Sequence, residues 1–161
     1  MTTRQKATTR IALTALATIS LLSFIGCAEY AVSITDQPTR KIDRQLIGDW
    51  ATADGGDVIK VRQLTESAYI ISYNGILFRA FHTDFGRVPF LSVQELETNI
   101  RTYSYVSYRL SPDGNKIYLK LVNEEVIPDD PTEIAAIQKS LNRNLQNPSL
   151  FHPEEEFRRQ Q

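Results

Sequence analysis

Alternating hydrophobic and polar positions dominate the chain from residue 46 to residue 122. Between Val58 and Leu64, for example, Ile59 and Val61 alternate with Lys60 and Arg62. This alternation puts successive side chains on opposite faces of a half-buried strand. Similar runs recur at short intervals, approximately at 46–51, 58–64, 69–73, 76–83, 88–96, 101–110 and 116–122. The pattern predicts a mainly β fold, an antiparallel meander of about seven or eight strands.

One turn between these runs also predicts their register. Asn74-Gly75 separates the run that ends at Tyr73 from the run that begins at Ile76. Both central residues of a type I′ turn need positive φ, which Asn and Gly adopt readily. The predicted hairpin pairs Tyr73 with Ile76, and Ile71 with Phe78. A meander of this size closes into a small barrel or forms a curved sheet, because exposed edges invite aggregation.

A helical periodicity follows the last run. Apolar residues recur every three or four positions and fall within about 80° on a helical wheel, at Ile134, Ile137, Leu141 and Leu145. The segment 130–133, Asp-Pro-Thr-Glu, has the form of a capping box with proline at the first helical position. We expect one C-terminal amphipathic helix from about 131 to 146 that packs on the sheet and closes a domain of residues 46–146.

Two polar stretches flank this domain. Residues 27–45 are predicted to be a tether, although the alternation of Tyr30, Val32 and Ile34 permits a short strand there. Residues 147–161 form a polar tail. In the tail, the spacing of Glu154–Arg158 and Glu155–Arg159 permits a last helical turn.

The first 26 residues have the order of a secretory signal peptide. Arg4, Lys6 and Arg10 precede a nearly uncharged stretch from Ile11 to Gly26, and Cys27 follows it. The stretch is shorter than the about 20 apolar residues that a spanning helix needs. A lone cysteine in an exported chain cannot form an internal disulfide, so Cys27 needs another explanation. The alternatives are a plain secretory signal with a chance cysteine and an uncleaved anchor.

Residues 21–27, Leu-Leu-Ser-Phe-Ile-Gly-Cys, resemble the lipobox of bacterial lipoproteins. The resemblance implies cleavage between Gly26 and Cys27, diacylglycerol on the Cys27 thiol and an acyl group on the new amino terminus. It implies no other cofactor. Ala28, in place of the Asp typical of inner-membrane retention, implies an outer-membrane lipoprotein that faces the periplasm if the cell is Gram-negative.

Charge narrows the range of partners. Residues 1–26 contain three of the 18 Lys and Arg residues and none of the 19 Asp and Glu residues, so the remainder has a net charge near −4. A mildly acidic domain argues against nucleic acid and polybasic lipid recognition. The membrane is contacted through the lipid anchor, and the remaining candidate partners are an envelope protein and a small apolar ligand.

The start of the β region resembles a second family. Gly48-Asp49-Trp50 matches the Gly-x-Trp motif that begins the first strand of lipocalins, and here too a helix follows the last strand. The resemblance implies a small lipocalin-like barrel in which Trp50 covers the closed end. A domain of this length argues against a roomy ligand cavity.

Catalytic motifs are missing from the sequence. It contains no Gly-x-Ser-x-Gly, no phosphate-binding Gly-rich loop and no His-Glu-x-x-His, and no metal site is predicted. His82 and Asp84 form a possible acid–base or metal pair, but an ordinary strand histidine is the simpler interpretation. The candidate ligand or partner face consists of aromatic residues, namely Trp50, Tyr69, Tyr73, Tyr103 and Tyr105. Cross-strand pairing of the tyrosines is the structural alternative.

These observations predict a non-enzymatic, lipid-anchored β domain of the cell envelope. The leading hypothesis is a structural or partner-binding module. The alternative is a lipocalin-like carrier of a small apolar ligand. A barrel filled with side chains and an exposed apolar patch would favour the first, and a pocket lined by Tyr and aliphatic residues would favour the second.

Overall fold

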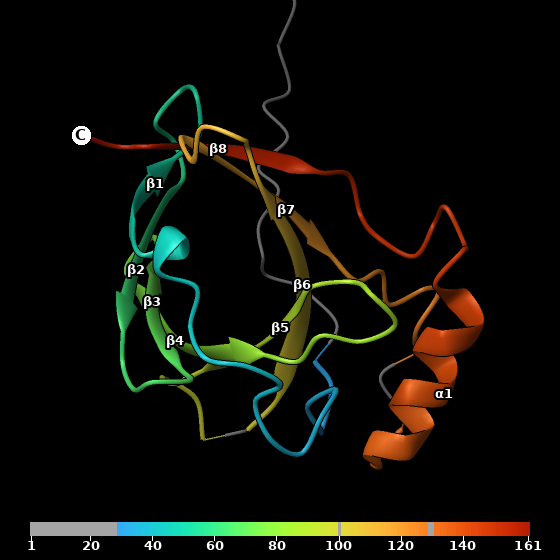
Figure 1. Ribbon diagram of the computed structural model, residues 1–161. Helices are drawn as coiled ribbons and strands as arrows, with labels where there is room; N and C mark the ends of the chain where they lie inside the picture. The colour runs from blue at the N-terminus through green and yellow to red at the C-terminus, as the bar shows by residue number, and fades with distance from the viewer. Residues whose placement is uncertain (1–28, 100, 129–130) are drawn as a thin grey trace, which may run out of the picture.

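Eight antiparallel strands pair in chain order, and β8 pairs with β1 to close a barrel (Figure 1). The structure is a computed structural model that describes residues 29–99, 101–128 and 131–161. The strands are β1 (Gly48–Ala51), β2 (Val58–Gln63), β3 (Tyr69–Tyr73), β4 (Ile76–His82), β5 (Phe90–Glu95), β6 (Tyr103–Leu110), β7 (Lys116–Leu121) and β8 (Glu155–Arg159). The predicted mainly β meander is confirmed, and of the barrel and the curved sheet it is the barrel that forms.

The β3–β4 hairpin has the predicted turn and register. Asn74 and Gly75 have φ values of 48° and 93°, as a type I′ turn requires. Tyr73 pairs with Ile76, and Ile71 pairs with Phe78. The strand bounds differ from the expected runs by only one or two residues at most ends.

The prediction for the C-terminal tail was wrong. Residues 155–159 form the eighth strand and not a helical turn, and they pair with both β7 and β1. Only Phe157 is both apolar and buried in this strand, so the charged residues around it hide the strand pattern. Because β8 pairs with both β7 and β1, neither of these strands is left with an unpaired edge.

The N-terminal stretch is also not a free tether. Tyr30 and Ile34 are fully buried, and a single β-bridge joins Tyr30 to Tyr103 without forming a strand. The segment continues along the outside of the barrel, where the backbone N–H of Ile34 donates to Ser92 Oγ and that of Thr39 donates to the carbonyl of His82. Burial of apolar residues of this segment against the barrel wall therefore offsets the conformational entropy that the segment loses on ordering.

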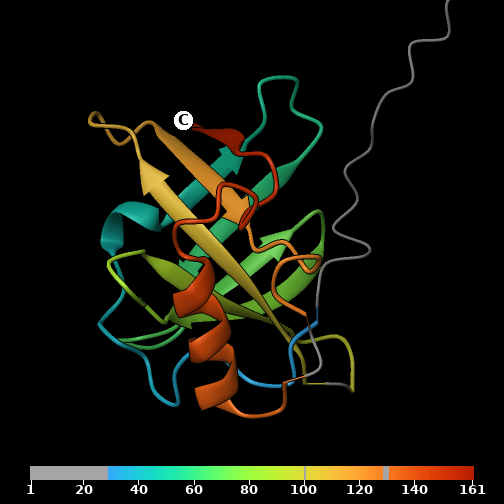
Figure 2. The same cartoon turned by 90° about the vertical axis from the view of Figure 1, so that its right-hand side faces the viewer.

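The one α-helix among the described residues, α1 (Ile134–Asn144), lies outside the barrel wall (Figures 1 and 2). It is shorter than expected: Glu133 is the N-cap without a side-chain hydrogen bond, and Asp130 lies outside the described residues. Ile137 and Leu141 from the predicted stripe are fully buried. They belong to an outer core between the helix, the N-terminal segment and the wall, together with Tyr30, Ile34, Phe90, Tyr105, Val122, Ile127 and Leu150.

A second, inner core fills one end of the barrel. It consists of Leu46, Trp50, Ile59, Val61, Tyr69, Ala80, Leu91, Tyr108, Ile117 and Phe157. The short 3₁₀ helix η1 (Arg44–Leu46) lies across this end, which we call the closed end (Figure 1). The opposite end, where β3 turns into β4 and where β6 and β8 begin, we call the open end.

Candidate functional site

A tryptophan–arginine pair holds η1 over the closed end. The Trp50 indole N–H donates to the carbonyl of Leu46 at 3.0 Å, and the Arg159 guanidinium lies 4.2 Å from the Trp50 ring. Arg159 also donates to the carbonyls of Gln45, Ile47 and Gly114. A cation over an indole face is attracted by the ring quadrupole. The pair therefore joins β8 to β1 and holds η1 in place.

Gly48 is required by this arrangement. Its φ is 154°, and a Cβ at this position would lie 2.4 Å from Arg159 Nη1. A side chain there would displace the guanidinium from its carbonyl partners. The spacing Gly48-x-Trp50 therefore supplies the ring and, two residues earlier, the space for the arginine that covers it.

A cluster of polar side chains lies next to η1 at the closed end. Tyr69 Oη and His82 Nε2 are 2.7 Å apart, and Arg40 donates to Tyr108 Oη at 2.5 Å and to Asp84 Oδ2 at 2.7 Å. Burial, reinforced by the positive charge of Arg40, lowers the pKa of His82 to about 4, so the ring is neutral at pH 7. Burial also raises the pKa of Tyr69 and of Tyr108.

Two atoms of this cluster have no hydrogen-bond partner. His82 Nδ1 and Asp84 Oδ1 are buried and lie 4.0 Å apart. Such atoms are candidates for acid–base chemistry, but His82 and Tyr69 are both fully buried beneath η1 and the preceding segment. A substrate cannot reach them in this conformation. The cluster therefore fixes the closed end and is not positioned as an accessible reactive site.

The open half of the barrel has a different lining. By register, several apolar side chains there share the inward face with the inner core but are only half-buried, namely Ile71, Phe78, Val93, Val106, Leu119 and Leu121. An eight-stranded barrel is just wide enough to be filled by side chains or to hold one small ligand. Ile71, Val93 and Leu119 pack against the inner core. Phe78, Val106 and Leu121 belong to neither core and are half-buried.

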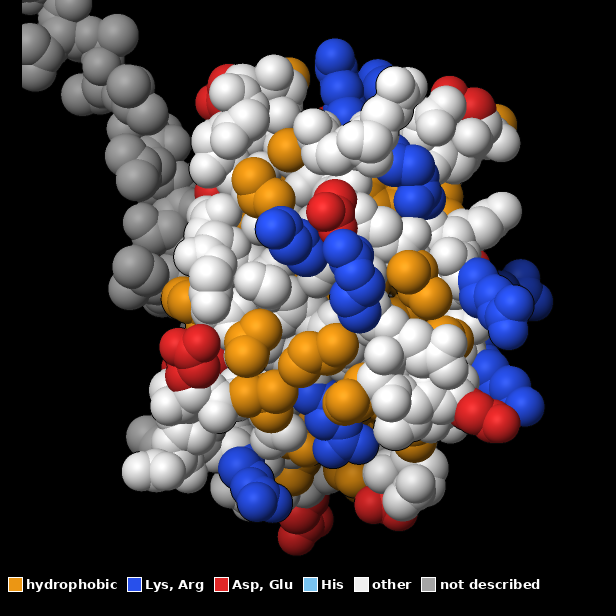
Figure 3. Space-filling model, turned by 90° about the vertical axis from the view of Figure 1, so that its left-hand side faces the viewer, with side chains coloured by type: hydrophobic (Ala, Val, Ile, Leu, Met, Phe, Trp, Pro, Cys, Tyr) orange, Lys and Arg blue, Asp and Glu red, His pale blue; other side chains and the backbone are white. Residues whose placement is uncertain are grey.

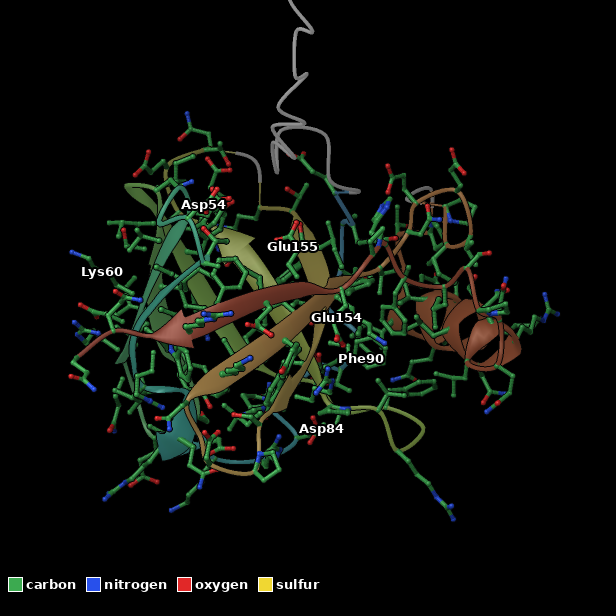
Figure 4. All side chains as sticks on the ribbon, turned by 90° about the horizontal axis from the view of Figure 1, so that it is seen from above. Asp54, Lys60, Asp84, Phe90, Glu154 and Glu155 are labelled. Carbon is green, nitrogen blue, oxygen red and sulfur yellow. The ribbon has the colours of Figure 1, made fainter. Side chains whose placement is uncertain are left out.

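A few polar groups stand at the open end. Tyr73 donates to Asp57 Oδ1 at 2.9 Å. Glu155 shares the inward face of β8 with Phe157, and burial, together with the charge of Asp57, raises its pKa. Seen from above in Figure 4, Glu155 and Asp54 lie toward one end of the barrel and Asp84 toward the other. The open half thus combines an apolar lining with a partly buried carboxyl group that could orient a ligand.

The predicted aromatic face is divided between several surroundings. Trp50 and Tyr69 are fully buried at the closed end, and Tyr73 faces inward at the open end. Tyr103 and Tyr105 lie on the outer side of β6 instead, where Tyr105 stacks on Tyr30 at 4.1 Å. These five residues do not form one ligand or partner face. Gly26 and Cys27 lie outside the described residues.

Sequence reasoning missed Arg159, Arg40 and Glu155. Arg159 and Glu155 were assigned to a tail because charged residues surround Phe157, and Arg40 to a tether because its segment is polar. A search for a period-2 pattern in 155–159, with Phe157 at its centre, is the signal that could have found the eighth strand. His82 and Asp84 were noticed, but their unpaired atoms could be seen only in the fold.

Within residues 29–99, 101–128 and 131–161, no group of three or more His, Cys, Asp and Glu side chains is arranged to hold a metal ion. Among these same residues, no helix has both the length and the apolar character that crossing a membrane requires. No protein family, no curated protein and no solved structure matches the chain.

Proposed function

We propose that the barrel is a non-enzymatic binding module for one small, largely apolar ligand, which enters through the open end. The observation that carries the proposal is the contrast along the barrel interior. Inward-facing residues of the closed half are packed into the inner core, whereas Phe78, Val106 and Leu121 of the open half are half-buried and belong to neither core. Apolar surface left inside a barrel is the kind of surface that an apolar ligand covers.

The resemblance of residues 21–27 to a lipobox adds a location to this proposal. The protein is then an envelope lipoprotein held by diacylglycerol and an acyl group on Cys27. Each buried methylene contributes about 0.8 kcal/mol, so two or three chains hold the protein stably on the membrane. The resemblance of Gly48-x-Trp50 to the lipocalin motif is in keeping with a carrier. Substitution of Cys27 by Ser tests the anchor: the variant is expected to leave the membrane fraction, and a variant that stays membrane-bound contradicts it.

A ligand-binding experiment tests the carrier function. The probe is N-phenyl-1-naphthylamine, a neutral apolar fluorophore that brightens in apolar surroundings. We expect the purified protein to bind it, and Val106→Trp, which fills the open half, to weaken binding at least about tenfold. Lys60→Trp is the matched control, because Lys60 is exposed on the outside of the barrel (Figure 4). No binding by the parent protein, or unchanged binding by Val106→Trp, would contradict the proposal.

Native mass spectrometry addresses the natural ligand. Protein purified from its own membranes is expected to carry a bound mass of a few hundred daltons that organic extraction removes. A bare protein, combined with no probe binding, would favour the second candidate function, a module that binds a partner protein. One observation favours that candidate: Leu77 and Leu96, both exposed, lie side by side at the open end, where the Leu96 N–H donates to the Leu77 carbonyl.

A further inference from the structure

We propose that the open end of the barrel docks on the surface of the lipid bilayer. This inference rests on the lipid anchor of the proposed function and adds an orientation to it. The bilayer then covers the exposed apolar residues of the open end, and the mouth of the barrel faces the membrane. Two features of the described chain support it: the place where the N-terminal segment is fixed and the position of the exposed apolar side chains. The short connection from the fixed point to Cys27 adds a third argument.

The N-terminal segment is fixed to the open end at Tyr30. The backbone groups of Tyr30 and Tyr103 exchange two hydrogen bonds of 2.8 Å, and Tyr103 is the first residue of β6. The Tyr30 hydroxyl donates to the carbonyl of Ile127 at 2.8 Å, and its ring stacks on Tyr105. A fully buried side chain with these bonds cannot swing away from the wall without breaking them.

Only three residue steps separate Tyr30 from Cys27. At about 3.5 Å for each extended residue, they span at most about 10 Å. A connection of this length keeps Cys27 within about 10 Å of Tyr30, whose bridge to Tyr103 is at the open end. Had the barrel been fixed to its N-terminal segment at the closed end, the same anchor would have held the mouth away from the bilayer.

The exposed apolar residues are concentrated at the same end. Four large hydrophobic residues of the described chain are exposed, and three of them are at the open end: Ile76 at 37%, Leu77 at 42% and Leu96 at 45%. We call these three residues the apolar rim. The fourth, Leu64, is 49% exposed and follows β2 at the closed end. By register, Leu77 and Leu96 lie on the outer face of the barrel wall and Ile76 lies on the inner face. Figure 3 shows hydrophobic side chains among Lys and Arg on the side of the barrel that carries β1 to β3.

The short connection favours the bilayer over a protein as the cover of the apolar rim. A folded domain of 100 residues has a radius of gyration of about 13 Å, so its diameter exceeds the about 10 Å that the connection spans. Side chains of Leu and Ile lower their free energy by entering the interface between headgroups and acyl chains. Asp54, Asp57 and Glu97 also lie at this end, so docking is expected to depend on apolar contact and not on attraction to anionic lipids.

Two variants, each with one added cysteine, test the orientation. Leu96→Cys and Leu64→Cys place a thiol at opposite ends of the barrel, at positions of similar exposure. Each variant is made with its own signal sequence, so that Cys27 is acylated and cannot react with a maleimide fluorophore. The labelled protein is purified and reconstituted into vesicles of phosphatidylethanolamine that contain a brominated phosphatidylcholine as a quencher in the lipid phase.

We expect lipid quenching to be several-fold stronger for the label at position 96 than for the label at position 64, and to be insensitive to 1 M salt. Equal quenching at the two positions, or stronger quenching at position 64, would overturn the docking and leave a partner protein as the cover of the apolar rim. If Cys27 itself reacts with the maleimide and the chain stays in the soluble fraction, the anchor fails together with the docking. Probe binding by the parent protein is measured separately, so a failure of the carrier function is recognised on its own.

Discussion

The two ends of the barrel contain similar residue types in very different surroundings. At the closed end, Phe157 is fully buried and part of the inner core. At the open end, Phe78 faces the same interior but is half-buried. The closed end also has the Trp50–Arg159 pair and the cluster around His82, whereas the open end has the inward-facing carboxyl groups of Glu95 and of Glu155, whose pKa is raised. The closed end is therefore the better packed of the two, and the open end is the one where we propose that a ligand binds.

The largest expected difference is between two phenylalanine truncations. Phe157→Ala should lower the free energy of unfolding by about 3–5 kcal/mol, because it leaves a cavity in a packed core. Phe78→Ala should cost well under half of this, because solvent already reaches the side chain. Urea denaturation of both variants measures the difference. Equal losses would show that the open half is as well packed as the closed half.

The buried histidine gives the closed end a pH dependence. An unfolded His has a pKa near 6.5, and His82 accepts a proton only near pH 4, so the unfolded chain binds more protons between these values. Stability should therefore fall as the pH drops through this window, by up to about 3 kcal/mol. His82→Gln should remove this contribution. Urea denaturation at pH 5 to 7 compares the two proteins, with His152→Gln as a control for the loss of a histidine that lies outside the closed end.

The arginine over Trp50 should matter more than its neighbour. Arg159→Ala breaks three hydrogen bonds to backbone carbonyls and the contact with the indole, so we expect a loss of about 2 kcal/mol. Arg158→Ala breaks only an exposed ion pair with Glu156, and its effect should be close to zero. Thermal unfolding of both variants measures the effect. A similar loss for both would mean that β8 is held by its backbone alone.

The smallest effect concerns the carboxyl group at the open end. Because the pKa of Glu155 is raised in the fold, the folded state binds more protons than the unfolded state just above the ordinary pKa of Glu, and stability falls as the pH rises through this range. Glu155→Gln should stabilise the protein at pH 7 by a fraction of a kcal/mol. Glu154→Gln, which loses an ion pair with Arg109, should instead destabilise it slightly. Opposite signs in denaturation at pH 7 confirm the prediction.

Local patterns predicted most of the barrel but not its closure. The β3–β4 hairpin was predicted down to its register because Asn74-Gly75 determines the turn by local chemistry alone. The pairing of β1 with β8 depends on contacts between residues at opposite ends of the domain, and no local pattern records it. The contacts of the candidate site likewise could not be predicted from local patterns. Burial of Tyr30 by Ile127 and Ile137, and the approach of Arg40 to Asp84 and Tyr108, arise only when distant segments meet.

The pairing of Trp50 with Arg159 also has a consequence for biosynthesis. The barrel cannot close until β8 has been synthesised, since β8 is the eighth strand in chain order and the partner of the first. A chain in which β8 has not yet been made has two open sheet edges and no arginine over Trp50. It therefore stays open until residues 155–159 have been added.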